Sequence, residues 1–363
     1  MKSAARIALS IAIGLFVFEI ALRVYNPLPF RVHGTHIVLP YGQSYTFHIG
    51  RSSKLDETVH HTKNSLGFRG PEPPRDWDRR LTVMTVGGST TECLFLSDGR
   101  TWTDAFARHL VAARDDAWVN NAGLDGQSTF GHLVLMRDVI GPMRPKVVLF
   151  LIGINDVARD RANTYDVALS DAPASPLRKT IDFAADHIEL AALAQNLMRV
   201  RHAQEAGFGH SEVDLRTVRH VPIEPDAMDR VLETHRAQYV GAFADRVSQL
   251  VAISRANGIE PVLITQPAIF GDGVDPTTGV DLRTVQSSGG ANGLLDWRLL
   301  ELYNDATRRV GAASRTVVID LARELPKDSR YFYDFIHYSN EGAQRVGDIV
   351  FDAFARSVLP HQK

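Results

Sequence analysis

The stretch TVGGSTTECLF, residues 85–95, joins the end of an apolar strand to a turn rich in hydroxyl groups. The preceding residues, 81–86, are apolar or β-branched and predict a buried strand. Gly87 and Gly88 remove side chains from the exit of this strand, and Ser89 is the first residue after it that can carry chemistry. Taken alone, the turn leaves open whether Ser89 is a nucleophile or part of an ordinary strand-to-helix connection.

Strands and amphipathic helices alternate from this point to the C-terminus. Further strands are predicted at 117–121, 146–152, 260–265 and 316–320, with helical spacing of apolar residues between them. The run at 146–152 is unbroken and apolar, as in a parallel strand covered on both faces. Thr101 and Asp104 form a capping-box pattern at the start of one helix. The chain therefore predicts an α/β fold with one five-stranded parallel sheet between helices.

Composition is that of an ordinary globular protein. The chain has 363 residues, of which 44% are hydrophobic and 23% charged, so it can bury a sizeable core. Its formal net charge of −2, with no long basic run, argues against a nucleic-acid partner. The single cysteine, Cys93, excludes an internal disulfide framework and is interpreted as a small core residue.

The N-terminus predicts a membrane anchor over residues 1–25. The run AARIALSIAIGLFVFEIAL, residues 4–22, approaches the roughly 20 residues that cross a bilayer. Lys2 and Arg6 favour a cytoplasmic N-terminus, which puts the body on the periplasmic or extracytoplasmic side of the cell membrane. Glu19 and Arg23 can pair near the outer interface. A cleaved signal peptide and a buried core helix are alternatives, but RVYNPLPF, which follows, lacks a small-x-small cleavage site.

The rest of the chain divides into two expected parts. Residues 26–80 are interpreted as a juxtamembrane extension of turns and short strands, and 81–360 as the α/β domain. Within the latter, 157–225 breaks the rhythm and is expected to be a partly helical insertion. The glycine-rich segment 271–293 is expected to be a mobile loop. The adjacent histidines at 60 and 61 have no partner at ligand spacing and are interpreted as surface residues, not metal ligands.

Residues able to carry chemistry follow the predicted strands. In an open parallel sheet, ligands bind at the carboxyl ends of the strands. Ser89 follows the first strand, NAGLDGQS (121–128) the second and GIND (153–156) the third, while DFIH (334–337) precedes the last helix. These segments supply a hydroxyl, glycine amides, a side-chain amide and an Asp/His pair. Acyl transfer through a serine needs these groups.

Each group has a physical role in that chemistry. A serine hydroxyl is a poor nucleophile until an imidazole accepts its proton, and an Asp three residues before a His can fix the tautomer of the ring. Glycine amides and an Asn side chain can donate hydrogen bonds to the oxyanion. Each motif alone is common in proteins of this size. Their ordered combination at the strand ends is far more specific.

In this order the motifs resemble the SGNH superfamily of GDSL-type esterases and lipases, over roughly residues 81–359. The resemblance implies a three-layer α/β/α fold with a flavodoxin-like sheet and no metal or cofactor. It implies that Ser89 is the nucleophile and that Asp334 and His337 complete the catalytic triad. Gly88 stands where the family motif has Asp; that Asp is not the catalytic acid, so the departure concerns only the local turn.

The same resemblance implies an oxyanion hole made by Ser89, Gly126 and Asn155. Together with the anchor it favours an esterase that removes an acyl group, acetyl among the candidates, from an envelope glycan through an acyl-serine intermediate. An O-acyltransferase, a lysophospholipase or thioesterase acting on lipid, and a non-catalytic envelope module are the alternatives. The full set of catalytic residue types argues against the last. Glu92 is interpreted as a capping or solvated residue that does not touch substrate.

Overall fold

The computed structural model of the chain describes residues 2–25, 32–33, 36–160, 176–205, 210–287 and 289–362. The predicted juxtamembrane extension and insertion are therefore described only in part. Residues 26–31, 34–35, 161–175 and 206–209, which belong to those two segments, lie outside the described residues.

A five-stranded parallel sheet forms the centre of the protein. Its strands are β5 (Leu81–Gly87), β6 (Ala117–Asn121), β7 (Val147–Ile152), β8 (Glu260–Thr265) and β9 (Val317–Ile319), in the order β6-β5-β7-β8-β9. This order is that of flavodoxin-like sheets. Every residue of β5 and β7 is buried, as expected for strands covered on both faces. The predicted fold class is confirmed.

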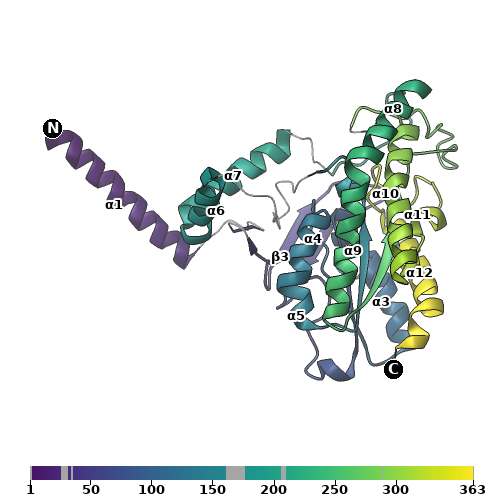
Figure 1. Ribbon diagram of the computed structural model, residues 1–363, viewed down its shortest axis with the longest axis horizontal. Helices are drawn as coiled ribbons and strands as arrows, with labels where there is room; N and C mark the ends of the chain where they lie inside the picture. Colours follow the sequence, from purple (N-terminus) through teal and green to yellow (C-terminus); the bar gives the residue numbers. More distant parts are fainter. Residues whose placement is uncertain are drawn as a thin grey trace.

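Helices cover both faces of this sheet (Figure 1). On one face lie α3 (Trp102–Ala113) and α12 (Asn340–Ser357); on the other lie α4 (Thr129–Leu135), α9 (Gly241–Ala256) and α10 (Gly293–Ser314). Val83 of β5 points into the first core with Phe106, whereas its neighbour Met84 points into the second with Tyr303. The alternation of side chains along a strand thus separates two cores. The predicted capping box at Thr101 is present at the start of α3.

The remaining elements are short or lie outside the sheet. The other helices are α1 (Lys2–Val24), α2 (Ser89–Glu92), α5 (Gly141–Met143), α6 (Pro176–His187), α7 (Glu189–Glu205), α8 (Pro225–His235) and α11 (Leu321–Glu324). Single turns of 3-10 or π type are η1 (Trp77–Arg79), η2 (Met136–Ile140), η3 (Ile154–Asp156), η4 (Arg236–Val240) and η5 (Leu359–His361). Two antiparallel pairs precede the sheet: β1 (Val32–His33) with β2 (His36–Ile37), and β3 (Ser44–His48) with β4 (Thr58–Thr62).

Helix α1 projects away from the sheet, with α6 and α7 beside its C-terminal end (Figure 1). Its stretch Ala5–Val24 is long and apolar enough to cross a membrane, and little of it is buried in the protein. Length and composition alone do not distinguish a permanent span from a signal sequence. Helix α1 is therefore a candidate membrane span, which is consistent with the expected anchor.

Two predicted segments pack against the body. The β3–β4 hairpin is followed by Lys63 and Arg69, which are buried against the turn after β5. Segment 271–293 contributes Leu282 and Val285 to the protein interior. The boundary between residues 80 and 81 and the mobility of segment 271–293 stay predictions.

Candidate active site

Ser89, His337 and Asp334 form a continuous hydrogen-bonded chain. The Nε2 atom of His337 lies 2.7 Å from the Ser89 hydroxyl oxygen, and its Nδ1 atom lies 2.6 Å from a carboxylate oxygen of Asp334. Ser89 is the first residue of α2 and is separated from β5 only by Gly88, whereas the other two lie in the turn before α12. The structure thus brings together the three residues that the motifs singled out.

The turn that holds Asp334 fixes its carboxylate. One carboxylate oxygen accepts the backbone N–H groups of Ile336, at 2.9 Å, and His337, at 2.7 Å, while the other faces the imidazole. Burial raises the pKa of this carboxyl, but the attraction of His337 and these hydrogen bonds outweigh it and leave the pKa below its usual value. The carboxylate is therefore ionised at neutral pH and can support a positive charge on the ring.

Gly88 allows a close approach of the Asn155 side chain to this turn. A Cβ atom on Gly88 would lie 2.3 Å from the Asn155 amide nitrogen and 3.0 Å from the Gln127 carbonyl oxygen. Asn155 stands on η3, after β7, and donates from its amide to that same carbonyl at 2.9 Å. An Asp side chain at position 88 would collide with Asn155, which is a physical reason for glycine here.

Gly126 lies in the loop that follows β6, beside the α2 turn. Its φ of +73° belongs to the left-handed region that favours glycine. The loop is tied down on either side of it, because Leu124 donates its N–H to Gly87 at 3.0 Å and Gln127 donates to Leu124 at 3.1 Å. Ser89, Gly126 and Asn155 therefore come from three neighbouring strand ends of one sheet edge.

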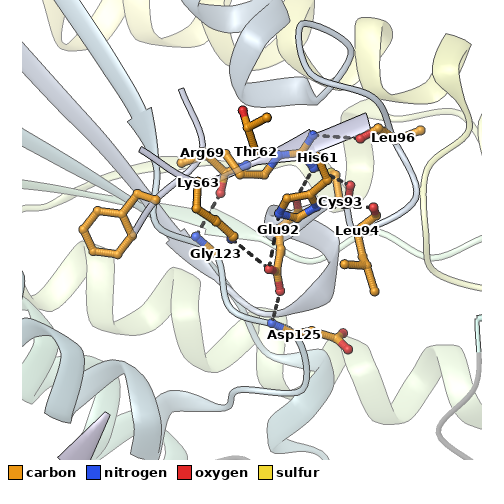
Figure 2. Close-up of polar contacts among 12 residues, drawn as sticks. His61, Thr62, Lys63, Arg69, Glu92, Cys93, Leu94, Leu96, Gly123 and Asp125 are labelled. Carbon is orange, nitrogen blue, oxygen red and sulfur yellow. Dashed lines mark hydrogen bonds and ion pairs between the residues drawn. The ribbon is translucent and has the colours of Figure 1, made fainter. Parts of the chain in front are cut away.

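A buried ion pair lies behind this loop (Figure 2). The Lys63 ammonium lies 2.9 Å from one carboxylate oxygen of Glu92, and the other oxygen accepts the N–H of Asp125 at 2.5 Å. Figure 2 shows Lys63 and Asp125 reaching the carboxylate from different sides. Asp125 immediately precedes Gly126, so Glu92 connects the α2 turn to the glycine loop. The interpretation of Glu92 as a capping or solvated residue is wrong, since its side chain is fully buried.

His61 lies beside the same pair. Its ring is buried, and burial together with the nearby Arg69 and Lys63 lowers its pKa to about 3, so it is neutral at physiological pH. The interpretation of both histidines as surface residues is therefore right for His60, which is exposed, and wrong for His61. The β4 strand alternates, and one of two consecutive residues must face the body.

Arg69 holds the exit of α2 from the other side. Its guanidinium donates to the backbone oxygens of Glu92, Cys93 and Leu96 at 2.7 to 2.9 Å. Cys93 is a core residue, as predicted, and burial raises the pKa of its thiol to about 12. Residues that precede the sheet thus take part in fixing the turn that carries Ser89.

A second histidine, His210, lies against the hydrogen-bonded chain. Its ring centroid is 4.2 Å from that of His337, and its nitrogens lie 3.2 Å from the Asp125 carboxylate and 2.9 Å from the Tyr333 hydroxyl. Burial lowers the pKa of His210, but Asp125 and the other nearby carboxylates outweigh it and raise the pKa above its usual value. Sequence reasoning did not single out His210, because it lies in the predicted insertion with no motif around it.

In the part of the chain that the structure describes, His210, Asp334 and His337 form the one group whose ligand atoms are close enough to hold a metal ion. His337 already forms hydrogen bonds with Asp334 and with Ser89. A cation held by all three would compete with those hydrogen bonds. The arrangement therefore suits proton transfer between serine and histidine better than metal binding.

Comparison with known proteins gave one family and several distant structures. A sequence model of the GDSL-like lipase/acylhydrolase family matches residues 85–345. Among solved structures, the acetylxylan esterase Axe2 from Geobacillus stearothermophilus is 15% identical with a TM-score of 0.42, covering 76% of this chain and 92% of that one. The lipase/acylhydrolase from Enterococcus faecalis is 16% identical with a TM-score of 0.41, covering 75% and 94%. No curated protein sequence matches the chain.

Proposed function

Because the chain belongs to the GDSL-like lipase/acylhydrolase family and is a hydrolase of ester bonds, we propose that Ser89, His337 and Asp334 are its catalytic triad. The observation that carries this proposal is the hydrogen-bonded chain of 2.7 Å and 2.6 Å that joins these three side chains. A non-catalytic module has no need for such a chain. Each residue then has a defined role in ester cleavage.

In the first half of the reaction the Ser89 oxygen attacks the ester carbonyl. As the new C–O bond forms, the proton of the hydroxyl passes to Nε2 of His337, and Asp334 stabilises the resulting imidazolium. His337 then gives this proton to the leaving alcohol, and an acyl-serine remains. In the second half a water takes the place of the alcohol, and its attack releases the carboxylic acid and restores Ser89.

The oxyanion of each tetrahedral intermediate needs donors that are already in place. We assign this role to the backbone N–H groups of Ser89 and Gly126 and to the side chain of Asn155. A carboxamide has two N–H donors, and the Gln127 carbonyl accepts one of them. The second is directed to the substrate in this proposal. Gln127 thereby orients the amide before substrate arrives.

The natural substrate in this proposal is an acyl ester, such as an acetyl ester, on a glycan of the cell envelope. The support is the candidate span Ala5–Val24 with Lys2 and Arg6 on its N-terminal side. This arrangement favours a body held at the extracytoplasmic face of the cell membrane. A reporter enzyme that works only outside the cytoplasm, fused after the last residue, tests this topology. An inactive reporter with an active cytoplasmic counterpart would contradict it.

Labelling with a fluorescent phosphonate tests the triad. The wild type should be labelled on Ser89, whereas Ser89→Ala should take no label and lose turnover, because no acyl-enzyme can form. His337→Ala should be nearly as damaging, since the two residues act as a unit. Ser248→Ala, an exposed serine on α9, is the matched control and should behave as wild type. A folded Ser89→Ala protein with undiminished turnover would refute the mechanism.

A substrate panel tests the chemical class. Acetyl esters, long-chain esters and acetylated sugars are compared, each with and without a free acceptor sugar. Preferred release of acetate from acetylated sugars supports the proposal. Preference for long-chain esters would point to a lysophospholipase or thioesterase instead. Acyl transfer to the added sugar in place of hydrolysis would identify an O-acyltransferase that uses the same acyl-serine.

A further inference from the structure

Exposed apolar side chains gather on helices α6 and α7. Among the described residues outside α1, large exposed apolar side chains elsewhere are single and scattered, which is normal for a protein surface. The α6–α7 pair instead carries six of them: Leu177, Ile181, Phe183, Ile188, Leu197 and Met198. Clustered exposed apolar surface of this kind marks an interaction site.

Most of the large exposed apolar residues at α6 follow helical spacing. Leu177 and Ile181 are four residues apart in α6, and Ile188, the first residue after the helix, follows Ile181 by seven, so these three lie on one side, whereas the exposed Phe183 lies off it. Lys179 and Asp186 lie on the opposite side. The helix is thus amphipathic, yet its apolar side is turned to the outside of the protein and not to a core. Ala185 and Ala192 are buried where the two helices meet.

The corner between α6 and α7 is attached to α1. The Glu19 carboxylate accepts the backbone N–H groups of Glu189 and Leu190 at 3.0 and 2.9 Å. Arg23 donates to Glu19 at 2.8 Å and also to the carbonyl oxygen of His187, at the end of α6. A charged residue within a membrane span is costly unless it is paired, and these contacts supply the pairing.

The position of Glu19 sets the depth of this corner. Glu19 lies five residues before Val24, the end of the candidate span. With a rise of about 1.5 Å per residue, its backbone lies roughly 7 to 8 Å inside that end. Amphipathic helices that lie on a bilayer bury their apolar side to about 5–10 Å. The depth of the Glu19 backbone thus lies within the range of depths at which surface-bound helices are found.

We propose that α6 and α7 form a second membrane contact, with the apolar side of α6 inserted into the lipid of the leaflet that Glu19 and Arg23 reach. The occupant of this surface is lipid because the surface is continuous with α1 through the contacts of Glu19 and Arg23. Figure 1 shows α6 and α7 beside α1 and apart from the sheet. The proposal rests on the anchor proposed above and adds a surface-bound element to it.

Site-directed fluorescence on the full chain tests the contact. The chain is reconstituted into vesicles of phosphatidylethanolamine and phosphatidylglycerol, and an environment-sensitive thiol label is placed at Leu177→Cys or Ile181→Cys. Cys93 is buried and its raised pKa of about 12 keeps it unreactive, so it can stay. Val111→Cys on α3 is the matched control, because Val111 is 47% exposed and Ile181 is 45% exposed. A label at Leu15→Cys on α1 reports whether the anchor helix lies in the bilayer.

Quenching by lipids with a nitroxide on the upper acyl chain, compared with quenching by aqueous iodide, gives the readout. We expect labels at 177 and 181 to be quenched by the lipid nitroxide several-fold more than the label at 111. If they behave like the label at 111 while the Leu15→Cys label is quenched by lipid, the anchor stands and the α6–α7 contact is refuted, whether water or a protein partner covers the surface. An unquenched Leu15→Cys label would refute both. Ester turnover in the same vesicles reports the hydrolase separately.

Discussion

Replacing Lys63 by Met removes the positive partner of a buried carboxylate without removing much volume. The Lys63 and Glu92 side chains are 2% and 1% exposed, and their charged atoms are 2.9 Å apart. In Lys63→Met the Glu92 carboxylate keeps the N–H of Asp125 but loses its ammonium partner. A buried charge without its counter-charge is strongly unfavourable.

The expected loss follows from that burial. Breaking a buried ion pair by removing one partner costs about 3–5 kcal/mol in the free energy of unfolding. At about 2–4 °C per kcal/mol, the value for domains of roughly 150–250 residues, the melting temperature should fall by at most roughly 6–20 °C. Turnover should fall as well, because Glu92 holds the loop that carries Gly126, and a shift of about 1 Å in a catalytic group can cost roughly 100-fold.

Thermal unfolding of the full chain in detergent measures this effect. Lys146→Met, at an exposed lysine, is the matched control and should change the free energy of unfolding by less than about 0.5 kcal/mol. Adding Glu92→Gln to Lys63→Met should restore most of the stability, because the buried charge is then gone. A Lys63→Met protein as stable as Lys146→Met at neutral pH would refute the reasoning.

Three further predictions concern the site and its surroundings. Asn155→Ala should lower turnover by about 10²–10³ with little change in folding, as for loss of one oxyanion donor, and steady-state kinetics with an acetyl ester would show it. Gly88→Ala should cause a comparable loss, because the added Cβ would lie only 2.3 Å from the Asn155 amide nitrogen and would push that side chain out of place. Unchanged turnover would contradict this close approach. The pKa of His61 is about 3 in the folded chain and 6.5 as the ordinary value, so unfolding takes up a proton and stability falls as the pH drops from about 6.5 to 3. Between pH 7 and pH 5 the free energy of unfolding should therefore fall by up to about 2 kcal/mol less in His61→Leu than in the wild type, as measured by urea unfolding.

The strands were predictable because each is a short apolar run bounded by polar or glycine residues. Residues 117–121 and 260–265 were predicted with the bounds that the structure has, β5 and β7 differ by one residue at one end, and β9 differs by one residue at each end. A parallel strand buried on both faces leaves a strong local pattern. The groups at the strand ends could be found for the same reason, since the sheet brings its carboxyl ends to one edge.

The buried polar groups were not predictable in this way. Glu92 looks like a surface residue in isolation, because charged side chains are mostly exposed, and His61 has no local signal for burial, because histidine is intermediate. Their burial depends on Lys63, which is 29 residues from Glu92 in sequence and comes from a part of the chain that lacks the strand–helix rhythm. His210 is 85 residues from Asp125, and nothing local indicates that the two meet.

The order in which the chain is synthesised gives the Ser89–His337 contact a further consequence. The two residues are 248 positions apart, and His337 is held in place by the turn before α12, which packs on α3. A chain is synthesised from its N-terminus at about 5–20 residues per second, so Ser89 leaves the ribosome well before His337 has been made. Closing so long a loop also delays the contact until most of the sheet has formed. In the proposed mechanism Ser89 therefore has no base during synthesis, and it becomes reactive only when α12 docks.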